Sequence, residues 1–266
     1  QILIEKELLC KAQKIINRAK KNAYQKEEFE LIFLIISLEI TLCFKHCFIE
    51  NYQKFLELQN ERNKIIEILN NIQHLLLIKT EYQQYQFNDY IDQTDIKNFE
   101  KIYGHSPFIP EENILSNRAK SIWLYNNFFY SYIIHDYETA FHYHSKLYDL
   151  FKNFPELFER KEVLQLINNF LYSCSLIKNE TLFNSLVNEF VSLKNQTKEE
   201  TWYIKRAIFI RTLELYHQLK QFNKANTLAL EAEEFLNVNT YFSSNFNIRY
   251  LQLLVIRAFV ENNNFY

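Results

Sequence analysis

The stretch IIHDYETAFHYHSKLYDLF, residues 133–151, holds three histidines beside tyrosines and acidic residues, the side chains that acid–base or metal chemistry uses. On a helix, residues two apart point about 200° away from each other, so His142 and His144 cannot chelate one metal ion together. His135 falls at the corner between two expected helices. The pattern therefore favours a helix corner over an active site, and we predict no catalytic residue here.

A second group of potential metal ligands lies in TLCFKHCF, where Cys43, His46 and Cys47 are spaced i, i+3 and i+4 on one helix face. A structural zinc site needs a fourth ligand, and no second Cys/His pair lies nearby in the sequence. Two buried cysteines and a surface histidine explain the spacing better than a metal site does. We therefore predict no metal site.

Phosphate loops and nucleophile elbows depend on glycine, and Gly104 is the only glycine of the chain. Neither a P-loop, a dinucleotide fingerprint nor a G-x-S-x-G elbow can be written with one glycine. The carboxylate pairs Glu27–Glu28 and Glu199–Glu200 lie near expected helix starts, where they complement the helix dipole. We therefore expect no cofactor and no enzymatic activity.

The composition of the 266 residues indicates an all-α protein, because one Gly and three Pro cannot supply the turns of a sheet. A formal net charge of −2 gives no reason to expect direct nucleic-acid binding. The most apolar run, LIFLIISLEITLCF, is interrupted by Glu39 and is shorter than a membrane span, so we expect no membrane segment. Four cysteines without disulfide spacing are typical of a reducing cytoplasm, where we place the protein.

Internal similarity organises the C-terminal half. The corner IIHDYETA resembles QLKQFNKA, with Tyr137 aligned to Phe222 and Ala140 to Ala225, and SLIKNETLF lies midway between them. The period is therefore about 43 residues, which is typical of arrays of helical hairpins. Helices are predicted over residues 117–134, 137–154, 162–176, 180–194, 199–219, 222–236 and 244–260.

The corners and ends of these helices carry stop and start signals. Asp136 and Asn179 are good N-cap residues, and Thr197 with Glu200 has the spacing of a capping box. Pro155 blocks continuation of the helix before it.

Three segments are expected along the chain. Residues 1–85 form helical hairpins that include one long helix, from about residue 49 to 85. Residues 86–113 form a loop-rich connection with room for one short helix, since the glycine and two prolines lie there. Residues 114–266 form the repeat array, which stops where a partner helix should begin; with no Met at position 1, both ends read as trimmed.

These repeats resemble those of tetratricopeptide proteins. The segment RTLELYHQLKQFNKANTLALEAEEF matches best, through Tyr216 and the small residues Ala225, Ala229 and Ala232. The family's usual helix-A glycine is replaced by Phe128, Leu171 and Leu213, and the period exceeds the usual one. The resemblance implies a right-handed α-solenoid of stacked antiparallel helix hairpins.

The whole chain is also similar to an uncharacterised family of helical-repeat proteins from Bacteroidetes bacteria. The matching segments are KELLCKAQKIINRAKKNAYQKEEFEL, NERNKIIEILNNIQHLL, RAKSIWLYNNFFYSYIIHDYETAF and LINNFLYSCSLIKNE. This resemblance implies a tetratricopeptide-like fold in proteins that continue past both ends of this chain, and no activity.

In such arrays the first helix of each hairpin lines a concave face, and its exposed positions can contact a partner. By alignment, these positions are Tyr125, Phe129, Tyr132, Asn168, Tyr172, Glu214 and His217. An asparagine amide can both donate to and accept from a peptide backbone, and a tyrosine offers a rigid amphipathic surface. The same rings could instead pack between neighbouring hairpins.

We therefore expect a non-enzymatic scaffold that binds a protein or peptide along the concave face. The alternative is the sensor domain of a transcriptional regulator whose DNA-binding segment lies outside this chain. Self-association as a homo-oligomer is left open.

Overall fold

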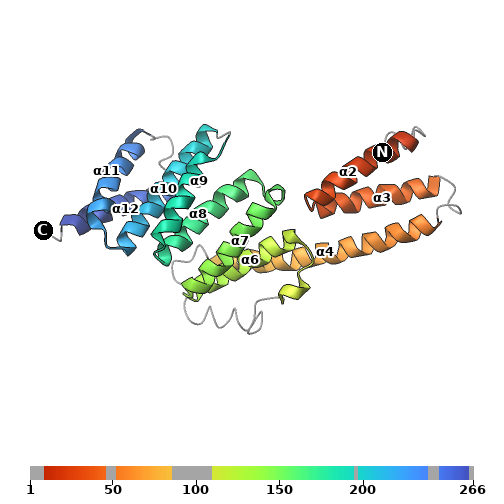
Figure 1. Ribbon diagram of the computed structural model, residues 1–266, viewed down its shortest axis with the longest axis horizontal. Coiled ribbons are helices and arrows are strands. Elements are labelled where there is room, and N and C mark those ends of the chain that lie inside the picture. Colours follow the sequence, from red (N-terminus) through yellow and green to blue (C-terminus); the bar gives the residue numbers. More distant parts are fainter. Residues whose placement is uncertain (1–8, 46–51, 86–109, 195–196, 239–245, 264–266) are drawn as a thin grey trace. The chain divides into compact units, whose positions relative to one another are not determined.

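The computed structural model describes residues 9–45, 52–85, 110–194, 197–238 and 246–263, and every regular element in these ranges is a helix (Figure 1). The predicted all-α class is confirmed for this part of the chain. From Asn117 onward each predicted helix is present, with ends within three residues of those predicted. None of the described helices is both long enough and apolar enough to cross a bilayer.

The chain divides into two compact units. The first comprises Gln1–Ile134 with Asp149–Phe158, and the second comprises His135–Tyr148 with Glu159–Tyr266. Of the predicted connection at 86–113, only residues 110–113 are described, and they include the short 3-10 helix η1 (Glu111–Asn113). The predicted three-segment division therefore stays a prediction.

The first unit is built around one long helix. Helix α2 (Leu9–Gln25) packs on α3 (Phe29–Lys45), α3 packs on α4 (Tyr52–Tyr85), and α4 packs on α6 (Asn117–Ile133). Helix α4 has 34 residues, and at about 1.5 Å per residue it is long enough to pack against both α3 and α6. The core combines aliphatic side chains, such as Ile32 and Leu75, with the aromatic rings of Phe29, Trp123 and Phe128.

The second unit contains most of α7 (Tyr137–Asn153), two helix pairs and a last helix. The pairs are α8 (Arg160–Leu176) with α9 (Glu180–Ser192), and α10 (Lys198–Gln218) with α11 (Phe222–Val238). Helix α12 (Phe246–Asn263) packs on both α10 and α11, and α8 packs on α10. Pro155, as predicted, ends the preceding helix and opens the 3-10 helix η2 (Pro155–Leu157), which belongs to the first unit. Within the second unit α8 packs on α9 and α10 packs on α11, while a solenoid of stacked hairpins remains a prediction.

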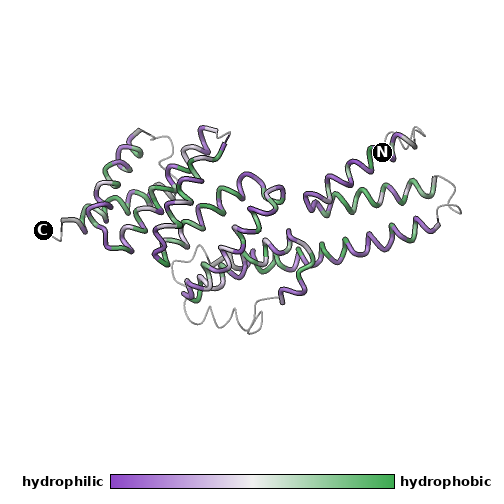
Figure 2. Tube along the Cα trace, in the orientation of Figure 1, coloured by the Kyte–Doolittle hydropathy of each residue, from purple (hydrophilic) through white to green (hydrophobic). Residues whose placement is uncertain are grey.

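Small residues allow the close approach of α11. Ala225, Ala229 and Ala232, the three alanines singled out in the sequence, have no exposed surface and pack against Leu213 of α10 and Leu251 of α12. Apolar and polar residues alternate along each helix, so that one side of each can be buried (Figure 2).

The helix corners repeat one backbone geometry without glycine. Lys178 and Lys220 adopt φ of 58° and 57°, in the left-handed region, and His135 and Glu27 do the same at 61° and 50°. After α8, the N–H of Asn179 donates to the carbonyl of Cys174 at 2.9 Å; after α10 the corresponding bond, from residue 221 to residue 216, is 2.8 Å. These are Schellman-type ends, for which glycine is the preferred residue.

The predicted caps follow directly after these corners. The side chain of Asn179 accepts from the N–H of Leu182 at 3.1 Å, and that of Asp136 accepts from Thr139, also at 3.1 Å. Thr197 and Glu200 form the predicted reciprocal capping box. The cap predictions are therefore confirmed.

Glycine at one of these corners should stabilise the protein. We expect Lys220→Gly to raise the free energy of unfolding by about 0.5–1 kcal/mol, because it removes the Cβ clash of a left-handed residue. Lys205→Gly, at an exposed position inside α10, should lower it by about 1 kcal/mol. Urea denaturation measures the free energy of unfolding of both variants. If both substitutions lowered it by the same amount, the left-handed assignment of Lys220 would be wrong.

Candidate functional site

The three histidines of the 133–151 stretch lie in three different environments. His135 is exposed at its corner, with Nδ1 2.9 Å from the hydroxyl of Tyr137, and His142 is exposed on α7. His144 is buried, with Nδ1 3.0 Å from Oγ of Ser173 and its ring stacked on Phe170 at 5.1 Å. Burial lowers the pKa of His144 to about 3, although a hydrogen bond with the backbone of Leu166 opposes the change. The buried imidazole is therefore neutral near pH 7, and the three rings do not converge.

The possible metal ligands of α3 can be followed only in part. Cys43 is buried and free, whereas His46 and Cys47 lie outside the described residues. Within the described ranges, no three His, Cys, Asp or Glu side chains are grouped so that they could hold a metal ion.

The predicted aromatic contacts of α6 lie in the first unit and pack mainly on one another. The ring of Tyr125 stacks on Phe129 at 6.2 Å, and Nζ of Lys79 lies 4.7 Å from the Tyr125 ring centroid. Tyr132 is half-buried and contacts Phe128 and Phe129. Phe129 is only 4% exposed, so its expected exposure is wrong. Aromatic neighbours on α6 contact the ring, and α4 packs against the same helix, so the side chain is enclosed.

The predicted polar contacts of the second unit meet at a residue that the sequence reasoning missed. Nε of Arg211 donates to Oδ1 of Asn168 at 3.1 Å, and its Nη1 pairs with Oε2 of Glu214 at 2.9 Å. The hydroxyl of Tyr250 donates to Oε1 of the same Glu214 at 2.9 Å. We call Asn168, Arg211, Glu214 and Tyr250 the polar ladder, because it links α8, α10 and α12.

Arg211 is held from several directions at once. Its guanidinium carbon lies 4.6 Å from the ring centroid of Tyr172, so α8 supplies both a hydrogen-bond acceptor and an aromatic face. Burial alone would lower the pKa of Arg211, but Glu214 outweighs it and the pKa is raised. The ladder is thus a fixed ion pair, not a proton donor or acceptor.

His217 continues this set of contacts nearer the end of α10. Its Nδ1 lies 2.7 Å from Oε2 of Glu261, and Nε of Arg257 donates to Oε1 of Glu261 at 2.7 Å. Burial would raise the pKa of Glu261, yet its pKa is lowered because Arg257 and His217 stabilise the carboxylate. His217 is 8% exposed, so its expected exposure is also wrong. The reason is that α12 packs over this part of α10.

The structure therefore brings Asn168, Tyr172 and Glu214 together, and it does so through Arg211. A signal was present in the sequence, because Asn168 and Arg211 are 43 residues apart and Arg211 precedes Glu214 by one helical turn. That spacing matches the repeat period, so residues at this separation face each other on neighbouring helices. Whether these residues also bind a peptide stays a prediction.

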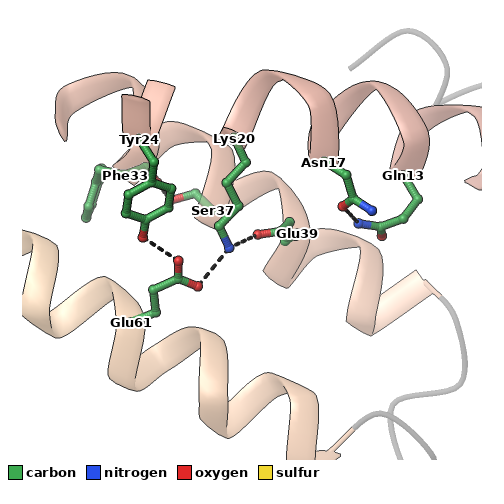
Figure 3. Close-up of polar contacts among 8 residues, drawn as sticks. All are labelled: Gln13, Asn17, Lys20, Tyr24, Phe33, Ser37, Glu39 and Glu61. Carbon is green, nitrogen blue, oxygen red and sulfur yellow. Dashed lines mark hydrogen bonds and ion pairs between the residues drawn. The ribbon is translucent and has the colours of Figure 1, made fainter. Parts of the chain in front are cut away.

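A second polar group in the first unit joins three helices (Figure 3). Nζ of Lys20 on α2 lies 2.6 Å from Oε2 of Glu39 on α3 and 2.7 Å from Oε2 of Glu61 on α4. The hydroxyl of Tyr24 donates to the other oxygen of Glu61. Glu39, the residue that interrupts the most apolar run, is thus buried next to a cation. The sequence analysis did not assign it this role.

This group does not have the properties of an acid–base catalyst. Burial would lower the pKa of Lys20, but hydrogen bonds with Glu39 and Glu61 outweigh it and the pKa is raised. Burial and the Glu61 carboxylate both raise the pKa of Tyr24. Both groups therefore hold their protons more firmly than in water, whereas a catalytic base needs a pKa near the working pH. The arrangement is suited to holding α2, α3 and α4 in register.

Comparisons with protein-family models, with curated proteins and with solved structures find no match to this chain.

Removing the carboxylate of the polar ladder should strand a buried cation. We expect Glu214→Gln to lower the free energy of unfolding by about 2–4 kcal/mol, because Arg211 would lose its ion pair inside the protein. Replacing both residues, as Arg211→Met with Glu214→Leu, should recover most of the loss. Arg257→Ala, which breaks a surface pair, should cost less than about 1 kcal/mol. Urea denaturation gives all three values, and equal effects of E214Q and R257A would refute the ladder.

Stability should depend on pH through His144. Its pKa falls from 6.5 in the unfolded chain to about 3 in the folded one, so the unfolded state binds the proton first. Below about pH 6.5 the free energy of unfolding should therefore fall, by up to about 1.4 kcal/mol per pH unit. Unfolding measured between pH 6.5 and 5 should show this slope, and His144→Gln should flatten it. The exposed control His142→Gln should leave it unchanged; a slope that persists in H144Q would disprove the assignment.

Proposed function

We propose that this protein is a non-enzymatic scaffold that binds a protein partner, and that α12 receives an amphipathic helix of that partner. The proposal retains the helical-repeat interpretation of the sequence, in which hairpins stack as a solenoid and present the first helix of each pair. It adds a specific surface for the contact.

The observation that carries the proposal is a stripe of apolar side chains on α12. Leu253, Ile256 and Val260 are 63%, 57% and 53% exposed. In contrast, no large apolar side chain of α8 or α10 is exposed among their described residues. Both of those helices pack against neighbours on several sides, whereas these three side chains of α12 are exposed.

The spacing and charge of the stripe favour a helical partner with acidic residues. Leu253, Ile256 and Val260 lie at i, i+3 and i+7, the seam along which two helices pack. Arg249 is exposed one turn before Leu253 on the same face, and Arg257 flanks Ile256. A partner helix that places a glutamate opposite Arg249 would complement both features.

The polar ladder limits where else a partner can bind. Asn168, Tyr172 and Glu214 are half-buried, so part of each remains accessible, but the Asn168 amide, the Tyr172 ring and the Glu214 carboxylate already contact Arg211 or Tyr250. A peptide that used them would first have to replace those bonds. The proposed contact at α12 requires no such exchange.

A designed peptide can test the stripe directly. The probe is a helical peptide with Leu and Ala along one face and Glu on its flank, and its binding is measured by fluorescence anisotropy. We expect Leu253→Glu with Ile256→Glu to weaken binding at least tenfold, because each buried leucine-sized contact is worth about 1.5–3 kcal/mol. Leu230→Glu, at an exposed site on α11, should leave binding unchanged.

Two outcomes would overturn this function. One is equal binding of the probe to wild type and to the doubly substituted stripe variant. The other is concentration-dependent self-association that the same substitutions abolish, because the stripe would then be an interface between copies. A probe with Lys in place of Glu should bind more weakly if Arg249 contributes as proposed.

A further inference from the structure

Helix α10 contains two arginines that are withdrawn from water in different ways. Arg211 has Asn168, Glu214 and the ring of Tyr172 around it. Arg206 is only 6% exposed, yet it makes no hydrogen bond or ion pair with any residue that the structure describes. Five residues apart on one helix, the two side chains face different neighbours.

Aromatic rings surround Arg206. Its guanidinium carbon lies 4.6 Å from the ring centroid of Trp202 and 5.3 Å from that of Tyr203. Trp202 stacks on Phe235 of α11 at 6.0 Å, and Tyr203 meets Phe190 of α9 edge-on at 6.5 Å. Arg206 therefore lies in an aromatic cradle on α10, formed by Trp202 and Tyr203 and backed by α9 and α11.

The cradle satisfies the cation only in part. Cation–π contacts contribute roughly 0.5–2 kcal/mol, whereas taking an unpaired charge out of water costs several kcal/mol. Burial accordingly lowers the pKa of Arg206, the opposite of the change at Arg211. A guanidinium has five N–H donors, and buried donors normally have acceptors.

The N–H donors of Arg206 are also not fully enclosed by the protein. Fully enclosed side-chain atoms without a hydrogen bond include Nε of Arg62, but no nitrogen of Arg206. The two rings lie against the guanidinium carbon, while its nitrogens are not fully enclosed. An acceptor arriving from solution could therefore bond to them.

We propose that Arg206 and its aromatic cradle form a binding site for a single carboxylate of a protein partner, either an acidic side chain or a chain terminus. A planar carboxylate matches the fork of a guanidinium with two parallel hydrogen bonds. One positive charge matches a monoanion, and the nearby Arg211 cannot add a second because Glu214 neutralises it. Only the identity of the carrier rests on the protein-binding function proposed above.

Trp202 provides a direct readout of the site. Trp123 is the other tryptophan of the chain, so Trp123→Phe leaves Trp202 as the sole indole fluorophore. We expect sodium acetate to change Trp202 emission saturably in the millimolar range, and sodium chloride at matched ionic strength not to do so. Arg206→Gln should abolish the response, and the exposed neighbour Lys205→Gln should keep it.

Several results of this titration would overturn the proposal. These are no saturable response to acetate, the same response in R206Q, or a response to chloride. Tighter binding of inorganic phosphate than of acetate would show that the site is not selective for a carboxylate. Because acetate needs no partner helix, the carboxylate site can fail while binding at α12 succeeds, and the reverse.

Thermal unfolding supplies an independent check that does not depend on a ligand. Arg206→Met should leave the Tm unchanged or raise it by a few degrees, because the free protein offers this cation no acceptor. Arg211→Met should lower the Tm, because it leaves the Glu214 carboxylate without its counter-charge. If R206M lowered the Tm as much as R211M, an acceptor within the chain would already satisfy Arg206 and the proposal would be wrong.

Discussion

A charged group that leaves water must find a counter-charge or hydrogen-bond partners, and this requirement explains the polar contacts between the helices. Lys20 meets it with Glu39 and Glu61, which come from two other helices. Arg211 meets it with Glu214 and with Asn168 of the neighbouring pair. Each set is satisfied only when its helices stand in one register, so polar pairing adds specificity to apolar packing that would tolerate sliding.

Apolar packing supplies the bulk of the stability, and its geometry depends on small residues and tight corners. The buried alanines Ala225, Ala229 and Ala232 let α11 approach its neighbours closely. The corners accept strained backbone at Lys178 and Lys220, although glycine would be easier there. Packing of the two helices on each side outweighs a local strain of about 1 kcal/mol. These corners thus turn without glycine.

The same contacts change the interpretation of the predicted concave binding face. Side chains selected as peptide contacts, such as Asn168 and Glu214, already bond to neighbouring helices. Two features make fewer contacts within the protein. The apolar stripe on α12 is exposed, and among the described residues the guanidinium of Arg206 contacts only aromatic rings. Both belong to the binding functions proposed above.

The sequence by itself determined the helical class, the helix ends and the corner caps, because these follow from neighbouring residues. Helix breakers and caps such as Asn179 and Thr197 act within a turn or two of the chain, and the 43-residue spacing of similar corners can be read directly from the sequence. Only the tertiary structure decided that Arg206 would lie between aromatic rings without an ion pair to any described residue, and that Phe129 and His217 would be buried. The reason is that burial and pairing of a side chain depend on the helices packed around it, and one helix's own periodicity does not specify which of its sides those neighbours cover.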